Sequence, residues 1–180
     1  METTRIVFSG SGGQGVITAA IVLAEAAVLH QNLNAVQTQS YGPEARGGAT
    51  RADVVLSQEP IRYPKVIHPN ILVSLTQEAY NKFAAIIRPG GLLLVDSRFV
   101  HTARRVDARQ VALPMHENVM QEIGKPVVFN ICMLGALTHL TKVLQPEAIV
   151  QALRSRVPGE FVEMNEKALN LGARLADQAA

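Results

Sequence analysis

Short apolar segments alternate with helical segments along this 180-residue chain, and this alternation restricts the possible folds more than any other feature. Apolar runs typical of buried strands occupy residues 5–9, 34–39, 50–57, 71–75, 92–95 and 110–113. Helical patterns occupy residues 16–29, 77–87, 116–123, 128–141, 146–156 and 162–179. The order predicts one α/β domain over residues 1–180, with three layers (α/β/α) and helices on both faces of an open sheet. Because no helical pattern separates residues 34–39 from 50–57, we expect a mostly parallel but mixed sheet.

Composition narrows the function classes. The net charge is +2 and no basic run accompanies it, so we expect no nucleic-acid partner. The longest apolar run, residues 16–29, is shorter than the roughly 20 residues of a membrane span, and the N-terminus carries no signal-peptide pattern, so we expect a cytoplasmic protein with no membrane partner. A single cysteine, Cys132, cannot build an iron–sulfur or zinc site alone, and the five histidines have no ligand spacing. We therefore expect no metal site in this chain.

A glycine-rich loop, GSGGQG, directly follows the first strand pattern and precedes the first helical pattern. Gly10, Gly12 and Gly15 match the dinucleotide fingerprint, and Gly13 and Gln14 lie between them. Glycines at such a turn let a phosphate approach backbone amides at a helix N-terminus. We therefore expect this loop to bind a phosphate-bearing cofactor. The alternative is that the glycines only permit tight packing of strand against helix.

The residues that would confirm a nicotinamide dinucleotide site are missing. Such a site needs an acidic side chain about 20 residues after the glycines, at the end of the second strand. Residues 35–40 read AVQTQS and contain no carboxylate. The loop is not a P-loop either, because no Gly-Lys-Ser/Thr follows it. A free-standing nucleotide-binding or NAD-linked α/β protein is therefore the competing interpretation of the sequence, and the missing carboxylate counts against it.

A second polar loop joins the second and third strand patterns, over residues 37–51 (QTQSYGPEARGGATR). Tyr41, Glu44, Arg46 and Arg51 could contact a phosphorylated or carboxylated ligand, because guanidinium groups match those oxyanions. Alternatively, a Glu44–Arg46 ion pair holds the loop for docking to another subunit. The two roles are compatible, and the sequence leaves both open.

The two loops together strongly resemble the gamma subunit, or fused gamma domain, of the 2-oxoacid:ferredoxin oxidoreductases. The resemblance rests on GSGGQG followed by SYGPEARGGATRADVVLS, and it extends to LLLVDS at residues 92–97 and to residues 130–137 (NICMLGAL). It covers essentially the whole chain. The glycine loop alone would be unspecific, but its pairing with SYGPEARGG at this distance is highly specific.

The resemblance implies a non-catalytic subunit of a larger enzyme. Family members convert a 2-oxoacid and coenzyme A to an acyl-CoA and CO2, and pass the electrons to ferredoxin. Thiamine diphosphate, Mg2+ and iron–sulfur clusters would then lie in partner alpha and beta subunits and in an additional ferredoxin-like delta subunit, if one is present. This chain would contribute no catalytic residue. It would support assembly and help to accommodate CoA, with the glycine loop and the Tyr41–Arg51 loop as the expected contacts.

The amino-acid sequence of the second loop is most similar to the 2-oxoglutarate branch of the family. Pyruvate, branched-chain oxoacid and indolepyruvate branches remain alternatives, because the oxoacid is expected to bind to other subunits. A purely structural subunit without any ligand contact is a further alternative.

Overall fold

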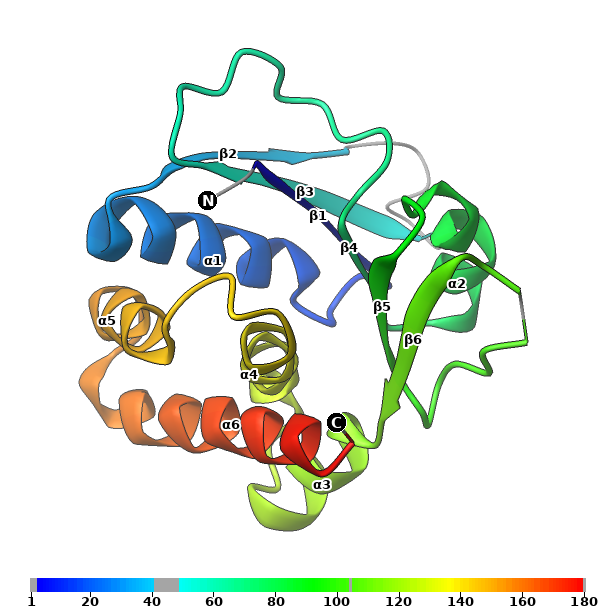
Figure 1. The fold of residues 1–180 in the computed structure, drawn as a ribbon. Helices are drawn as coiled ribbons and strands as arrows, with labels where there is room; N and C mark the ends of the chain where they lie inside the picture. The colour runs from blue at the N-terminus through cyan, green and yellow to red at the C-terminus, as the bar shows by residue number, and fades with distance from the viewer. Residues whose placement is uncertain (1–2, 41–48, 104, 180) are drawn as a thin grey trace.

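A mixed sheet forms the centre of the molecule (Figure 1). The computed structural model describes residues 3–40, 49–103 and 105–179. Within these residues the strand order is β2-β3-β1-β4-β5-β6. The strands are β1 (Thr4–Gly10), β2 (Asn34–Gln39), β3 (Thr50–Ser57), β4 (Ile71–Ser74), β5 (Gly91–Asp96) and β6 (Ala108–Leu113). Strand β3 is antiparallel to both β1 and β2, whereas β1, β4, β5 and β6 are parallel. The expected mixed, mostly parallel sheet is confirmed.

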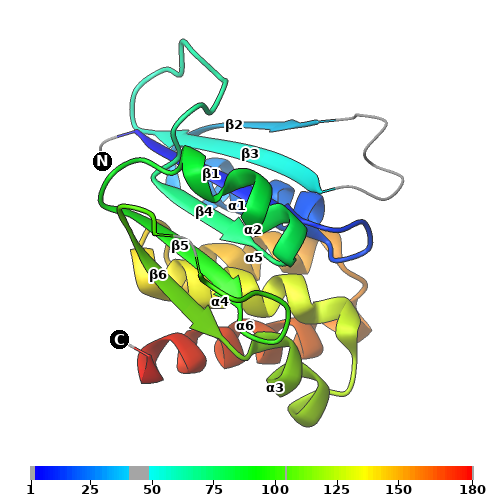
Figure 2. The ribbon, with the colours of Figure 1, turned by 90° about the vertical axis from the view of Figure 1, so that its right-hand side faces the viewer.

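Helices cover both faces of the sheet, but unequally (Figures 1 and 2). They are α1 (Val16–Gln31), α2 (Gln77–Phe83), α3 (Met115–Glu122), α4 (Phe129–Thr141), α5 (Pro146–Arg156) and α6 (Gly159–Gln178), with short 3-10 turns η2 (Ala84–Ile86) and η3 (Pro126–Val128). Helix α2 covers one face, and α1 and α4 cover the other, with α5 and α6 packed outside them. The predicted α/β/α arrangement is therefore confirmed, with most of the helical mass on one side. None of the described helices combines the length and apolar composition needed to cross a bilayer.

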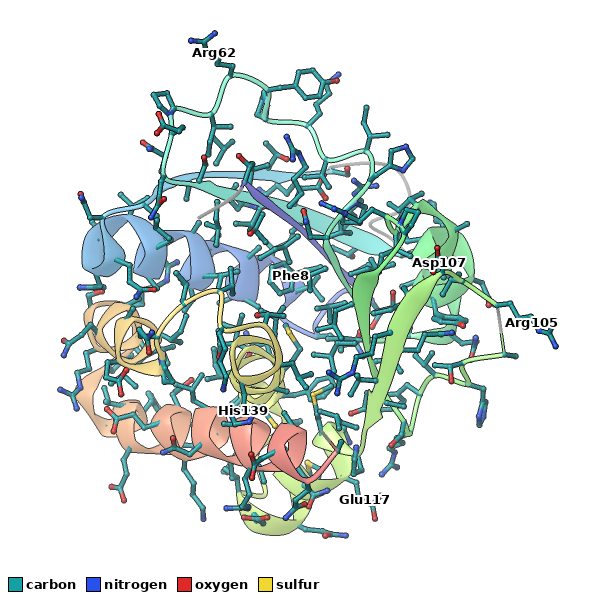
Figure 3. All side chains as sticks on the ribbon, in the orientation of Figure 1. Phe8, Arg62, Arg105, Asp107, Glu117 and His139 are labelled. Atoms are coloured by element: carbon teal, nitrogen blue, oxygen red, sulfur yellow. The ribbon has the colours of Figure 1, made fainter. Side chains whose placement is uncertain are left out.

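Two apolar cores lie on opposite faces of the sheet. Ile6 and Phe8 of β1 point into the larger core, toward α1 and α4, and Figure 3 shows Phe8 between the sheet and these helices. Val7 points into the smaller core, where it meets the α2 side chains Tyr80 and Phe83. All three β1 side chains are fully buried. A central strand covered on both faces is apolar along its length, which explains the uninterrupted IVF in this strand.

Helices α4 and α6 cross in backbone contact. A Cβ atom added at Gly135 would overlap the carbonyl oxygen of Leu169, and one added at Gly172 would overlap the carbonyl oxygen of Cys132. His139 lies on α4 beside α6 (Figure 3), and its Nε2 is 3.3 Å from an Asp177 carboxylate oxygen. Only glycine permits so close a crossing, because any Cβ would separate the two helices. The crossing buries nearly all of α4 and accounts for its apolar sequence.

Two helix boundaries differ from the sequence prediction by more than two residues. The helix expected at residues 77–87 ends at Phe83 and continues as a 3-10 turn over Ala84–Ile86. Pro89 disfavours helical geometry at Arg88, which limits any further extension. The last helix begins at Gly159 instead of residue 162. Pro158 and Gly159 resemble a helix break in the sequence, but proline is favourable where a helix starts.

Candidate functional site

The glycine loop lies at the carboxyl end of the parallel strands, directly between β1 and α1. Its neighbour in the sheet, β4, is followed by α2, which covers the opposite face from α1. Chain connections therefore diverge to opposite faces at β1 and β4. Open α/β sheets bind ligands outside the carboxyl ends of strands at such a point. The topology thus places the loop where a ligand site is expected.

Gln14 holds the shape of the loop. Its side-chain oxygen accepts a hydrogen bond from the Ser11 amide at 2.8 Å, and its Nε2 donates to the Leu75 carbonyl at 3.2 Å. One side chain therefore ties the loop both to itself and to the end of β4. The side chain of Gln14 therefore positions the loop directly before the start of α1.

Two of the loop glycines are required by packing. A Cβ at Gly10 would lie 2.5 Å from the side-chain oxygen of Gln14, and one at Gly15 would lie 2.6 Å from Nδ2 of Asn130. Gly15 also has a φ of 71°, in the left-handed region that favours glycine. The packing explanation therefore accounts for Gly10 and Gly15.

The other two loop glycines face open space. No atom of the described residues, beyond the chain neighbours, lies within 4 Å of a Cβ added at Gly12 or Gly13. Gly13 has a φ of 88°, so its backbone conformation favours glycine, whereas Gly12 does not have a positive φ. Neither sterics nor backbone conformation in the described residues requires glycine at position 12. At Gly12 the backbone is not covered by a side chain and borders open space.

The loop ends in a helix N-terminus that no side chain caps. Gly15 is the N-cap of α1, and it has no side chain to accept a hydrogen bond from the first-turn amides. Such amides carry a partial positive charge and favour an anion. Asn130 in α4 contacts the cap residue, and its Nδ2 donates to the Gly15 carbonyl at 3.2 Å. The arrangement is chemically suited to a phosphate group.

The second loop of the sequence analysis lies largely outside the described residues, including Tyr41, Glu44 and Arg46. Arg51 is described, on β3. Its guanidinium forms two hydrogen bonds to the Asp53 carboxylate, at 2.7 and 2.9 Å, and a third to the Val66 carbonyl at 2.6 Å. It also lies over the Phe83 ring, on the α2 face of the sheet. Arg51 therefore has internal partners, and its contact with a ligand remains a prediction.

Two ionisable groups are buried in the core, Asp96 at the end of β5 and Cys132 in α4. Burial raises the pKa of the Cys132 thiol to about 12, and the negative charges of Asp96 and Glu122 add to this effect. Burial also raises the pKa of Asp96, at the end of β5, while the amides of His116 and Arg98 donate to its carboxylate and lower it. In the described part of the chain, no three His, Cys, Asp or Glu side chains gather as metal ligands would. The Asp96 carboxylate thus has two amide donors, and Cys132 is a buried free thiol.

Comparison with known proteins defines the family. The model of the pyruvate ferredoxin/flavodoxin oxidoreductase family matches residues 5–175. The chain is 47% identical over 176 residues to the 2-oxoglutarate synthase subunit KorC of Methanocaldococcus jannaschii, covering 97% of this chain and 94% of that protein. It also superposes with a TM-score of 0.89 and 41% identity on the gamma subunit of a keto/oxoacid ferredoxin oxidoreductase from Geobacter sulfurreducens, covering 98% and 99% of the two chains. The chain therefore belongs to the pyruvate ferredoxin/flavodoxin oxidoreductase family, as a gamma subunit of the 2-oxoacid:ferredoxin oxidoreductase type.

The relatives also separate by branch. Identity to the pyruvate synthase subunit PorC of Methanothermobacter marburgensis is 28%, well below the 47% to the KorC subunit of M. jannaschii. The resemblance seen in the sequence is thus confirmed, and so is its similarity to the 2-oxoglutarate branch. In the sequence, Asn130 belongs to the segment 130–137 that resembles the family. Its link to Gly15 spans 115 positions, and no local pattern signals it.

Proposed function

We propose that this gamma subunit serves a 2-oxoglutarate:ferredoxin oxidoreductase. The reaction converts 2-oxoglutarate and CoA to succinyl-CoA and CO2; two electrons pass to oxidised ferredoxin and one proton is released. The observation that carries this proposal is the greater similarity to 2-oxoglutarate synthase subunits than to the pyruvate synthase subunit. The chain itself supplies no catalytic group in this proposal.

The catalytic chemistry belongs to partner subunits in this proposal. Alpha and beta subunits hold thiamine diphosphate with Mg2+, and cysteine-rich parts hold the iron–sulfur clusters that reduce ferredoxin. A ferredoxin-like delta subunit completes the assembly where it is present. This chain matches only 36% of the length of the ketoisovalerate oxidoreductase subunit VorA of Methanothermobacter marburgensis. A gamma-like fold can thus be one part of a larger polypeptide.

The role proposed for this chain is to bind CoA at the glycine loop. The open space at Gly12 and Gly13 and the uncapped start of α1 support a phosphate at this position. Gly10, Gly15 and Gln14 hold the loop in place. Tyr41, Glu44 and Arg46 remain proposed contacts, either to CoA or to a neighbouring subunit, and Arg51 is a less direct one because Asp53 already pairs with it.

The test is a kinetic comparison in the assembled enzyme. Gly12→Val places a branched side chain in the open space without disturbing a packed neighbour. We expect the KM for CoA to rise about tenfold, equivalent to about 1.4 kcal/mol, while the KM for 2-oxoglutarate stays within about twofold. Activity with pyruvate in place of 2-oxoglutarate serves as the substrate comparison.

The control for backbone effects is Gly90→Ala. Gly90 has a φ of 72° and also faces open space, but it precedes β5 and so lies at the amino end of the parallel strands, whereas the glycine loop lies at their carboxyl end. Equal KM values for CoA in the wild type and in Gly12→Val would overturn the loop assignment. A complex that turns over pyruvate faster than 2-oxoglutarate would overturn the substrate assignment.

A further inference from the structure

Strand β2 forms one edge of the sheet, and no strand of the described residues pairs with its outer side (Figure 1). The two edges of the sheet differ in charge. Strand β6, at the opposite edge, carries the exposed Arg109, whereas β2 has the sequence NAVQTQ and no charged residue. Proteins usually protect an open edge with charges, proline or a bulge, because its backbone groups attract further strands. The uncharged and regularly paired β2 is therefore an edge that another strand can extend.

The hydrogen-bond ladder shows which backbone groups of β2 face outward. The Ser40 amide donates to the Arg51 carbonyl at 3.1 Å, and this pair continues the register between β2 and β3. In an antiparallel ladder, hydrogen-bonded and non-hydrogen-bonded residue pairs alternate. Val36 therefore bonds inward to β3, whereas Ala35 and Gln37 direct their N–H and C=O groups outward. The outward groups thus flank Val36 on both sides.

Helix α1 lies beside this edge and leaves apolar side chains uncovered. Val28 is 47% exposed and Leu29 is 63% exposed, near the end of the helix. Both side chains line a shallow groove of about 450 Å³ between α1 and β2. The groove is also lined by Ile21, Ala24, Glu25, Ala35 and Gln37. An apolar helix face of this kind is normally packed against another apolar surface.

The groove carries no free charge. Its one acidic residue, Glu25, forms an ion pair with Arg156 at 2.5 Å, and the other residues that line it are uncharged. In a contact around a two-fold axis, each surface meets a copy of itself. A charged surface would then repel its own copy, because like charges come together. A neutral face of this kind suits a second copy of the chain.

We propose that two copies of this chain associate edge to edge, with their β2 strands paired antiparallel around a two-fold axis at Val36. Ala35 of each copy then exchanges backbone hydrogen bonds with Gln37 of the other copy. The two Val36 side chains lie opposite each other at the axis. The sheet continues from one copy into the next, and the two α1 helices lie on the same face of it. This proposal goes beyond the proposed function and does not depend on CoA binding.

The same axis covers the exposed side chains of α1. Helix α1 lies over β2 and β3 about equally. The two α1 helices are therefore separated by two strand spacings, or about 10 Å, which is a normal distance between packed helices. Val28 and Leu29 of each copy then face the α1 helix of the other. A single strand from a different partner would extend the sheet but leave these side chains exposed, so a second copy fits better.

A cysteine at position 36 tests the axis in the assembled enzyme. Cα atoms of a non-hydrogen-bonded antiparallel pair are about 4.5 Å apart, which a disulfide can span. We expect Val36→Cys to give a covalent dimer of this subunit after mild oxidation, as a non-reducing gel would show. Thr38→Cys is the matched control, because the two copies of residue 38 would lie about 14 Å apart along the strands. The native Cys132 is buried and should not cross-link.

An exchange of charge at the axis provides the second test, on the full chain. Val36→Lys and Val36→Glu each bring like charges together, so each variant alone should dimerise about tenfold more weakly than the wild type in sedimentation velocity. An equimolar mixture should recover the dimer, because the added lysine then meets the added glutamate. Such recovery also shows that both variants are folded. Ala112→Lys, at an exposed position of the opposite edge strand β6, should leave the dimer unchanged.

Three results would overturn the proposal. The first is a Val36→Cys subunit that cross-links to a different subunit of the enzyme. The second is a wild-type chain that stays monomeric at every concentration, together with no cross-link in the enzyme. The third is equal cross-linking of Val36→Cys and Thr38→Cys, which would mean random collision. None of these results involves the KM for CoA, so the CoA proposal would stand or fall separately.

Discussion

Glycines occur in two regions of this molecule for opposite reasons. At the α4–α6 crossing, Gly135 and Gly172 leave no room for a Cβ, because the backbone of the other helix occupies that space. In the loop after β1, Gly12 and Gly13 face open space among the described residues. The first pair stabilises the fold of the isolated chain. The second pair leaves room for something from outside the chain, which we propose to be CoA.

The reactivity of the Cys132 thiol tests how tightly α4 and α6 are packed. Burial raises its pKa from the ordinary 9.0 to about 12, which lowers the thiolate fraction at pH 8 by roughly a thousandfold. We expect Cys132 to resist iodoacetamide in the folded protein and to react fully in denaturant, as mass spectrometry would record. Rapid labelling of the folded protein would contradict the packing described here.

The same pKa change has a defined effect on stability. The folded state holds the neutral thiol, so unfolding becomes more favourable as pH rises from about 9 toward 12. Below pH 9 the thiol is neutral in both states, and its contribution does not change with pH.

Gly135→Ala should have the largest effect on stability. Its Cβ would overlap the Leu169 carbonyl, so the two helices must separate. We expect a loss of about 3 kcal/mol in the free energy of unfolding, measured in urea. Gly159→Ala is the control, since position 159 in α6 is open and has no positive φ. An equal effect of the two substitutions would contradict the close crossing.

Gly13→Ala should destabilise the chain through its backbone alone. With φ at 88° and open space around it, alanine there costs about 1–2 kcal/mol. Gly90→Ala, at a φ of 72° and equally open, should cost the same. We expect only Gly13→Ala to raise the KM for CoA in the assembled enzyme. A matching change in Gly90→Ala would show that the kinetic effect comes from general destabilisation.

Gly12→Ala should have the smallest effect on stability. Nothing among the described residues crowds its Cβ and its φ is not positive, so the free energy of unfolding should change by less than about 0.5 kcal/mol. Thermal unfolding of the isolated chain measures this. A loss of more than about 2 kcal/mol would mean that position 12 is structural, and the contrast with Gly135 would fail.

Local patterns in the sequence predicted much of the fold. The strands at residues 34–39 and 50–57 were predicted at their observed limits, because polar and glycine-rich segments bound them. The missing helix between these strands predicted a mixed sheet, and β3 is the strand that runs antiparallel to its neighbours. The predicted start of α6 at residue 162 is wrong, because Pro158 and Gly159 are compatible with both a helix break and a helix start.

Contacts between distant segments could not be predicted in the same way. The glycine loop was identified from its spacing, but the division into packed Gly10 and Gly15 and open Gly12 and Gly13 depends on Gln14 and Asn130. The contact between Asn130 and Gly15 forms only after α4 has packed against the start of α1, and the Asn130 Oδ1 that it leaves without a partner among the described residues arises in the same way. Such features belong to tertiary structure, because no run of neighbouring residues encodes them.

The comparison between packed and open glycines is tested most directly by CoA binding to the assembled complex that carries Gly12→Val. Titration calorimetry would compare it with the wild-type complex and with the Gly90→Ala complex under identical salt conditions. If the open glycines make room for CoA, the Kd should rise about tenfold in Gly12→Val alone. An unchanged Kd in a complex that assembles normally would contradict the account, and would make the loop a structural turn.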